Sequence, residues 1–106
     1  MSRFTLADLQ QRVHERAKAS ATESYTRALL DKGVAYCAKK LGEEAIETAM
    51  AAVQEDKSRL IAEAADLIYH LLVVLEARGA TLAEVEDELE KRTARSGHQE
   101  KASRRS

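Results

Sequence analysis

The sequence predicts an all-α fold, a bundle of four to five helices, and three observations support this prediction. The 106 residues include no proline and only four glycines, so few positions would interrupt a helix. Only 4% of the residues are aromatic, so aliphatic side chains and alanine must build the core. Apolar residues recur at helical spacing between glycines and capping residues. At this length we expect one domain spanning residues 1–106.

Capping residues mark where the expected helices begin. The helices are expected at about 6–18, 24–32, 34–54, 57–78 and 81–95. Thr5 with Asp8, and Thr81 with Glu84, have the spacing of a capping box, in which the two residues bond each other's backbone amides. Asp56 is the expected N-cap of the fourth helix.

Glycines end three of these helices, and one glycine lies inside a helix. Gly33, Gly79 and Gly97 each follow a helical stretch, where a left-handed backbone conformation favours glycine. Gly42 lies within the third helix, where it costs about 1 kcal/mol relative to alanine. We therefore expect another backbone or a ligand to approach Gly42 closely.

The fourth helix is apolar almost all the way round between Leu67 and Leu75. A helix of this kind is buried on every side. A chain this short has few helices with which to surround it. We therefore expect a second copy of the chain to cover one face, which makes the protein a homodimer.

Two pairs of carboxylates are the strongest chemical signal in the chain. Glu44 and Glu47 are three residues apart, as are Glu63 and Asp66, so each pair shares one face of its helix. The two pairs are symmetric about residue 55, within the polar break between the third and fourth helices. If that break is an antiparallel turn, Glu47 faces Glu63 and Glu44 faces Asp66.

Four facing carboxylates repel one another unless a cation lies among them. A solvated helix face would explain Glu44 and Glu47, but Glu63 and Asp66 lie in an otherwise apolar stretch. Burying unpaired acids costs several kcal/mol. Mg²⁺ is the expected cofactor because it binds oxygen ligands.

Three neighbours of the acids have two interpretations each. Glu43 would lie in the outer shell of the metal site or be exposed to solvent. Lys40 would pair with a carboxylate or reach a substrate phosphate. His70 would hydrogen-bond Asp66 and orient it, or would be a core histidine.

Charge is distributed unevenly along the chain. Residues 1–90 hold 17 Asp or Glu and 11 Lys or Arg side chains, whereas residues 91–106 hold six Lys or Arg and one Glu. The basic tail, about 96–106, has no aromatic side chain to stack on bases. A phosphate ligand, or a solvated tail, is therefore expected rather than a nucleic acid.

Membrane and disulfide signals are weak. The longest apolar run is Leu71–Leu75, far short of a membrane span. Cys37 is the single cysteine, falls at an apolar helical position and is expected to be a small buried hydrophobe. We expect a cytoplasmic protein with no membrane partner.

Two motifs resemble one enzyme family. Lys40-Leu-Gly-Glu-Glu-Ala-Ile-Glu47 and Glu63-Ala-Ala-Asp-Leu-Ile-Tyr-His-Leu-Leu-Val73 are similar to phosphoribosyl-ATP pyrophosphohydrolases, which belong to the MazG-like all-α superfamily. The Ser24-Tyr25-Thr26 segment with Lys32-Gly33, and Arg92 followed by Ser96-Gly97, extend the resemblance. Glu23 differs from the family, in which a small residue is expected before Ser-Tyr-Thr.

The resemblance implies Mg²⁺-dependent hydrolysis of phosphoribosyl-ATP to phosphoribosyl-AMP and pyrophosphate, the second step of L-histidine biosynthesis. The acids Glu44, Glu47, Glu63 and Asp66 would hold Mg²⁺, and Glu44 or Glu47 would take the proton of the attacking water. The substrate-binding candidates are Ser24, Tyr25, Thr26, Lys32, Lys40, Arg92, Ser96, Gly97 and Lys101.

Two other functions fit parts of the pattern. A housecleaning nucleoside triphosphate pyrophosphohydrolase could use the same scaffold and metal site. A non-enzymatic dimeric helical adaptor would need only the helices and the basic tail. Pyrophosphate release from phosphoribosyl-ATP, with ATP and dUTP as controls, separates the three hypotheses.

Overall fold

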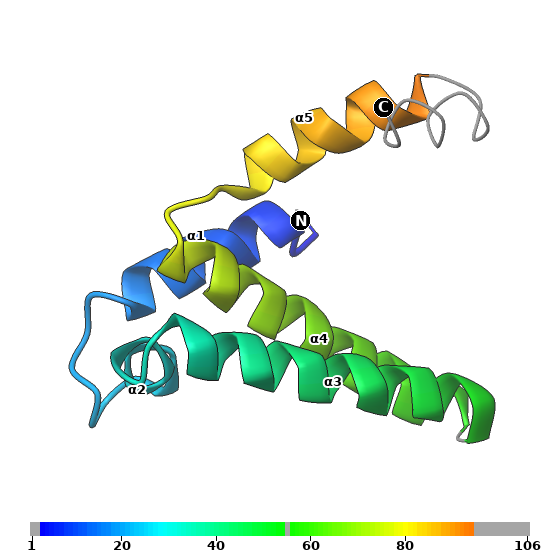
Figure 1. Ribbon diagram of the computed structural model, residues 1–106, viewed down its shortest axis with the longest axis horizontal. Coiled ribbons are helices and arrows are strands. Elements are labelled where there is room, and N and C mark those ends of the chain that lie inside the picture. The colour runs from blue at the N-terminus through cyan, green and yellow to red at the C-terminus, as the bar shows by residue number, and fades with distance from the viewer. Residues whose placement is uncertain (1–2, 55, 95–106) are drawn as a thin grey trace.

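A long antiparallel hairpin of two helices dominates the computed structural model, which describes residues 3–54 and 56–94 (Figure 1). The arms of the hairpin are α3 (Val34–Gln54) and α4 (Lys57–Ala77), with 21 residues each. The other helices are α1 (Leu6–Arg16), α2 (Tyr25–Asp31) and α5 (Leu82–Thr93). Every element of the described residues is helical, so the all-α prediction is confirmed.

The predicted helix starts agree with the structure because the capping residues act as expected. Thr5 with Asp8 and Thr81 with Glu84 both form complete capping boxes. The Asp56 side chain accepts a hydrogen bond from the Arg59 backbone N–H at 2.9 Å. The bounds of α3 are as predicted, and the other helices end one or two residues earlier than expected.

Two glycines have the predicted role, and at a third one of the two predicted contacts is absent. Gly33 and Gly79 have φ angles of +97° and +70°, in the left-handed region that ends a helix at low cost. At Gly42, a Cβ atom would meet nothing within 4 Å. The expected approach of another backbone to Gly42 is therefore wrong within the described chain, and the approach of a ligand stays a prediction.

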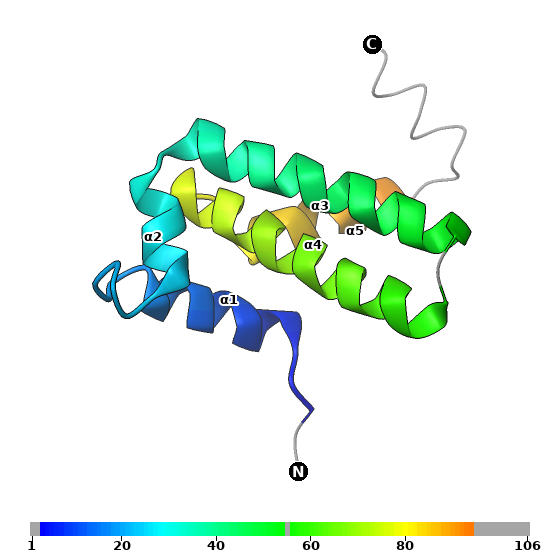
Figure 2. The same ribbon diagram turned by 90° about the horizontal axis from the view of Figure 1, so that it is seen from below.

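The shorter helices pack around one end of the hairpin. α1 lies against α4, and α2 contacts α1, α3 and α4 where the hairpin begins (Figure 2). α5 contacts α1, and the Leu82 backbone N–H donates to the Gln10 side chain at 2.6 Å. The buried core consists of Val13, Leu29, Cys37, Leu72, Val73 and Leu82.

Cys37 is the buried hydrophobe that the sequence predicts. Its side chain is buried and its thiol donates to the Leu29 carbonyl at 3.2 Å. Burial raises the pKa of the Cys37 thiol, which keeps it protonated and unreactive.

The single chain leaves large apolar side chains uncovered along the hairpin. In α4, Val73 is fully buried but Leu71 is 39% exposed. On α3, the side chains of Ile46, Met50 and Val53 are exposed at helical spacing. None of the described helices combines the length and apolarity that a membrane span requires.

Candidate functional site

The two acidic pairs lie opposite one another on α3 and α4. The Thr48 hydroxyl connects the helices at this level, because it lies 2.7 Å from the Glu44 carbonyl oxygen and 3.0 Å from the Glu63 carbonyl oxygen. A small polar side chain here brings the two helices close together. Sequence reasoning missed Thr48, whose position between Glu44 and Glu63 depends on how the helices pack.

Three of the four acids form a compact group that could hold a metal ion. Glu44, Glu63 and Asp66 each offer a carboxylate oxygen, and these oxygens lie within 4.8 Å of one another. Glu63 is buried, Glu44 is half-buried and Asp66 is exposed. The group is therefore buried at Glu63, between the helices, and open to solvent at Asp66.

Buried oxygen atoms in this group lack hydrogen-bond partners. Glu44 Oε2 and Glu63 Oε2 are both buried, and neither has a partner among the described residues. Unpaired buried carboxylate oxygens are costly unless a cation neutralises them. The donor set of carboxylate oxygens fits a hard divalent cation such as Mg²⁺.

The electrostatics of the group are those of crowded acids. Burial, and then the neighbouring Glu47 and Asp66, raise the pKa of Glu44. Burial also raises the pKa of Glu63, while the guanidinium of Arg59 acts in the opposite direction. Glu44 and Glu63 thus resist ionisation beside the other acids, and a bound cation would reverse this effect.

The remaining acid, Glu47, is exposed and lies outside the compact group. It is close enough to Glu44 to raise the pKa of Glu44. It also lines a hollow of about 160 Å³ together with Arg59 and Glu63. Glu47 is therefore a carboxylate at the edge of the group, next to open space.

Lys40, one turn before Glu44, pairs with Glu43. Lys40 Nζ lies 3.3 Å from Glu43 Oε1. This pairing raises the pKa of Lys40, so its charge persists at neutral pH. Of the two interpretations of Lys40, the structure has the ion pair with a carboxylate, and contact with a substrate phosphate stays a prediction.

His70 is a buried histidine in this structure. Of the two interpretations of His70, the structure has the core histidine. Its Nδ1 atom has no partner among the described residues, and the ring makes no hydrogen bond to Asp66. Burial lowers the pKa of His70, as does the nearby Lys40. The ring packs edge-on against Tyr69 with centroids 5.1 Å apart. His70 is therefore a neutral core group with one unused polar atom.

The Ser24-Tyr25-Thr26 segment begins α2 and has a mainly structural set of contacts. Ser24 caps α2 by accepting from the Arg27 N–H at 3.1 Å, and it donates to the Arg16 carbonyl at 2.9 Å. Thr26 is buried and bonds Tyr69. Tyr25 is 60% exposed and stacks on Tyr69.

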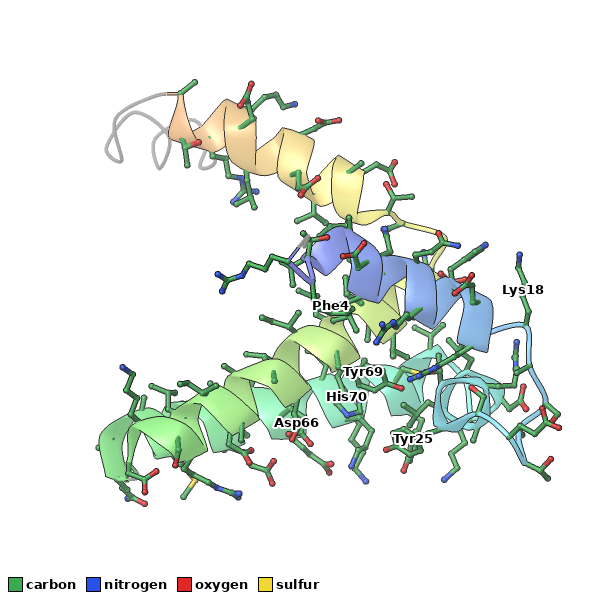
Figure 3. The ribbon with its side chains drawn as sticks, turned by 180° about the vertical axis from the view of Figure 1, so that it is seen from behind. Phe4, Lys18, Tyr25, Asp66, Tyr69 and His70 are labelled. Carbon is green, nitrogen blue, oxygen red and sulfur yellow. The ribbon has the colours of Figure 1, made fainter. Side chains whose placement is uncertain are left out.

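Tyr25 is thus the residue of this segment that a ligand can reach. Figure 3 shows Tyr25, His70 and Asp66 along the same side of the hairpin. The exposed tyrosine ring and the acidic group therefore share one face of the molecule. A nucleotide could lie along that face with its phosphates at the acids.

Other substrate-binding candidates lie farther from the acids in the chain or outside the described residues. The Lys32 ammonium lies over the Tyr36 ring, 4.5 Å from its centroid. Arg92 pairs with Glu88 on α5, with Nε and Oε2 3.0 Å apart. Ser96, Gly97 and Lys101 lie outside the described residues, as does the basic tail.

Comparison with known proteins identifies close relatives. Residues 6–93 match the phosphoribosyl-ATP pyrophosphohydrolase family. The chain is 62% identical over 102 residues to a phosphoribosyl-ATP pyrophosphatase of Azorhizobium caulinodans, covering 96% of this chain and 94% of that protein. It is 59% identical over 105 residues to phosphoribosyl-ATP pyrophosphatase 1 of Bradyrhizobium diazoefficiens, covering 99% of both. A phosphoribosyl-ATP pyrophosphatase of Rhizobium rhizogenes is 59% identical over 104 residues.

Proposed function

Because the chain belongs to the phosphoribosyl-ATP pyrophosphohydrolase family, we propose that it hydrolyses phosphoribosyl-ATP to phosphoribosyl-AMP and pyrophosphate. The family makes it a hydrolase, which excludes the adaptor hypothesis. The reaction would be the second step of L-histidine biosynthesis, and the enzyme would act in the cytoplasm. The matched region, residues 6–93, includes both acidic pairs.

The observation that carries this proposal is the group of three carboxylates, two of which have a buried oxygen without a partner. Glu44, Glu63 and Asp66 would hold Mg²⁺, with Glu47 at the edge of the group. An ion bound there would neutralise phosphate oxygens and acidify the attacking water. The open side at Asp66 leaves room for the triphosphate.

The protein's own residues would position the substrate and move a proton. Glu47 is exposed and lies outside the compact group, so we assign it the role of the general base that takes the proton of the attacking water. Lys40 keeps its positive charge and is one turn from Glu44, where it can leave Glu43 for a phosphate oxygen. The exposed Tyr25 ring would bind the nucleoside end of the substrate by stacking.

The proposal includes a homodimer. The exposed stripe of Ile46, Met50 and Val53 on α3, together with Leu71 on α4, is an apolar surface that a second copy would cover. The Cα radius of gyration is 15.9 Å, whereas a compact chain of this length has roughly 13 Å. A single chain of this open shape would bury more of its apolar surface by associating with a second copy.

The test is pyrophosphate release from phosphoribosyl-ATP by the purified protein in Mg²⁺. We expect turnover that stops in excess chelator, with much slower release from ATP and dUTP. Equal rates on ATP or dUTP would favour the housecleaning alternative. Undiminished turnover in chelator would contradict the metal site.

A further inference from the structure

Arg59 bonds the most buried carboxylate of the acidic group. Arg59 Nη2 lies 3.1 Å from Glu63 Oε1, one helical turn away on α4. The Glu63 side chain is only 7% exposed, whereas the Arg59 side chain is 58% exposed. Sequence reasoning missed this pair. The guanidinium therefore reaches in from solvent to neutralise one oxygen of Glu63, while Oε2 stays without a partner.

The Arg59 guanidinium and a divalent cation would compete for the same carboxylate. Two cations that share Glu63 repel each other strongly in a partly buried site. The Arg59 side chain is exposed, so it can turn into solvent, whereas the Glu63 side chain is buried. Ion binding at Glu63 would therefore release the guanidinium.

The hollow beside Arg59 is a suitable place for the released guanidinium to bind an anion. Its volume is about 160 Å³, and it is lined by Glu47, Met50, Ala51, Gln54, Arg59 and Glu63. Arg59 is the one basic side chain in that lining. The hollow adjoins the acidic group on the side of the α3–α4 turn.

A second cation, Lys40, flanks the acids from the opposite end. α3 runs toward the turn, so Lys40, which precedes Glu44, lies on the side of the acids away from the turn. α4 runs away from the turn, so Arg59, which precedes Glu63, lies on the turn side. Tyr25 belongs to α2, which packs at the Lys40 end of the hairpin (Figure 2). The two ends of the site thus differ, with an aromatic ring at one end and a guanidinium at the other.

We infer that Arg59 is the counter-ion of Glu63 in the ion-free enzyme and transfers to the pyrophosphate group of the substrate when a divalent cation takes Glu63. This inference rests on the proposed function. The phosphate chain then runs along the hairpin, with the nucleoside at Tyr25 and the pyrophosphate near the turn. A guanidinium suits this role because it can bind two phosphate oxygens at once.

Ion affinity tests the first half of the inference. Mn²⁺ is titrated into the ion-free protein and free Mn²⁺ is measured by electron paramagnetic resonance, for the wild type, Arg59→Gln and Arg78→Gln. Arg78 is the exposed C-cap of α4. Arg78→Gln is the matched control because this substitution removes the same charge at the far end of the helix. We expect Arg59→Gln to bind Mn²⁺ about threefold more tightly, the scale of a partly exposed ion pair, and Arg78→Gln to match the wild type.

Binding of inorganic pyrophosphate in saturating Mg²⁺ tests the second half. We expect affinity to fall about tenfold in Arg59→Gln, as for loss of a charge-assisted hydrogen bond. Arg59→Lys should keep part of the affinity, and Arg78→Gln all of it. Circular dichroism checks that each variant is folded.

Either negative result overturns the inference. Unchanged or weaker Mn²⁺ binding in Arg59→Gln means that the guanidinium does not compete for Glu63. Unchanged pyrophosphate binding means that it does not transfer to phosphate. Wild-type turnover of phosphoribosyl-ATP is measured separately, so failure of the proposed function is distinguishable from failure of the role of Arg59.

Discussion

The hydroxyl groups of Thr26 and Tyr69 lie 2.6 Å apart and join α2 to the middle of α4. Thr26 is only 1% exposed, so water cannot replace this bond. Burial raises the pKa of Tyr69. The exposed Tyr25 ring stacks on the Tyr69 ring, with 6.4 Å between their centroids. This hydrogen bond therefore fixes the position of Tyr25 relative to the α3–α4 hairpin.

Removing the Thr26–Tyr69 bond should destabilise the protein. Thr26→Val leaves the half-buried Tyr69 hydroxyl without its partner, and we expect a loss of about 1–3 kcal/mol. Urea unfolding at fixed protein concentration measures it. Tyr69→Phe should cost a similar amount, and the double variant little more than either single variant. Additive losses in the double variant would show that the bond contributes nothing. Thr93→Val, at an exposed position, is the control and should change stability by less than about 0.5 kcal/mol.

Neutralising one acid of the metal group should separate activity from stability. We expect Asp66→Asn to abolish Mg²⁺-dependent turnover and to weaken Mn²⁺ binding at least tenfold, because it removes a charged ligand. The ion-free variant should melt no lower than the ion-free wild type, since repulsion among the acids falls. Asp87→Asn, an exposed acid on α5, is the control. Undiminished turnover in Asp66→Asn would refute the metal site.

A charge at Leu71 should disrupt the proposed dimer. Leu71 is 39% exposed in the single chain, so glutamate there clashes little with the chain's own core. We expect Leu71→Glu to sediment as a monomer at micromolar concentration, because burying an unpaired charge in an interface is costly. Thr22→Glu, at an exposed position in the turn before α2, should remain dimeric. A wild-type protein that is a stable folded monomer would contradict the dimer.

The N-cap of α4 should give a stability term that depends on pH. Hydrogen bonds from the Arg59 N–H and from Ser58 lower the pKa of Asp56 below its ordinary value of 3.8. The ionised carboxylate therefore contributes stability above pH 3.8, and this contribution is lost as the pH falls through the lowered pKa. We expect Asp56→Ala to lower the urea midpoint at pH 7, and the difference from wild type to shrink below pH 4.

Asp56→Asn keeps a capping oxygen that does not titrate, so its capping contribution should not change with pH. A constant difference between wild type and Asp56→Ala across this range would count against the ionised cap.

Deleting residues 92–106 tests the basic tail. The deletion removes Arg92 and the candidates Ser96, Gly97 and Lys101, so we expect KM for phosphoribosyl-ATP to rise at least about tenfold, or roughly 1.4 kcal/mol of binding. Mn²⁺ affinity should be unchanged, because the metal group lies on α3 and α4. An unchanged KM would place substrate recognition in the helical hairpin alone.

The order and limits of the helices could be predicted because their signals are local. The capping boxes at Thr5 and Thr81 each depend on residues three positions apart, and Gly33 and Gly79 act through their own backbone angles. The meeting of Glu44 with Asp66 could also be anticipated. It follows from two straight helices joined by a tight turn, so the spacing of the acids in sequence becomes their spacing across the hairpin.

The rotation and close approach of the helices are properties that only the tertiary structure decided. They put the Thr48 hydroxyl against both helices, leave Glu47 outside the compact group and leave open space at Gly42. The docking of α2 pairs Thr26 with Tyr69, two residues 43 positions apart in the chain. Periodicity shows which face of a helix is apolar, but side-chain packing sets how that face is turned toward its neighbour. The placement of Arg59 on Glu63 likewise depended on side-chain packing, because a long exposed side chain has several partners within reach.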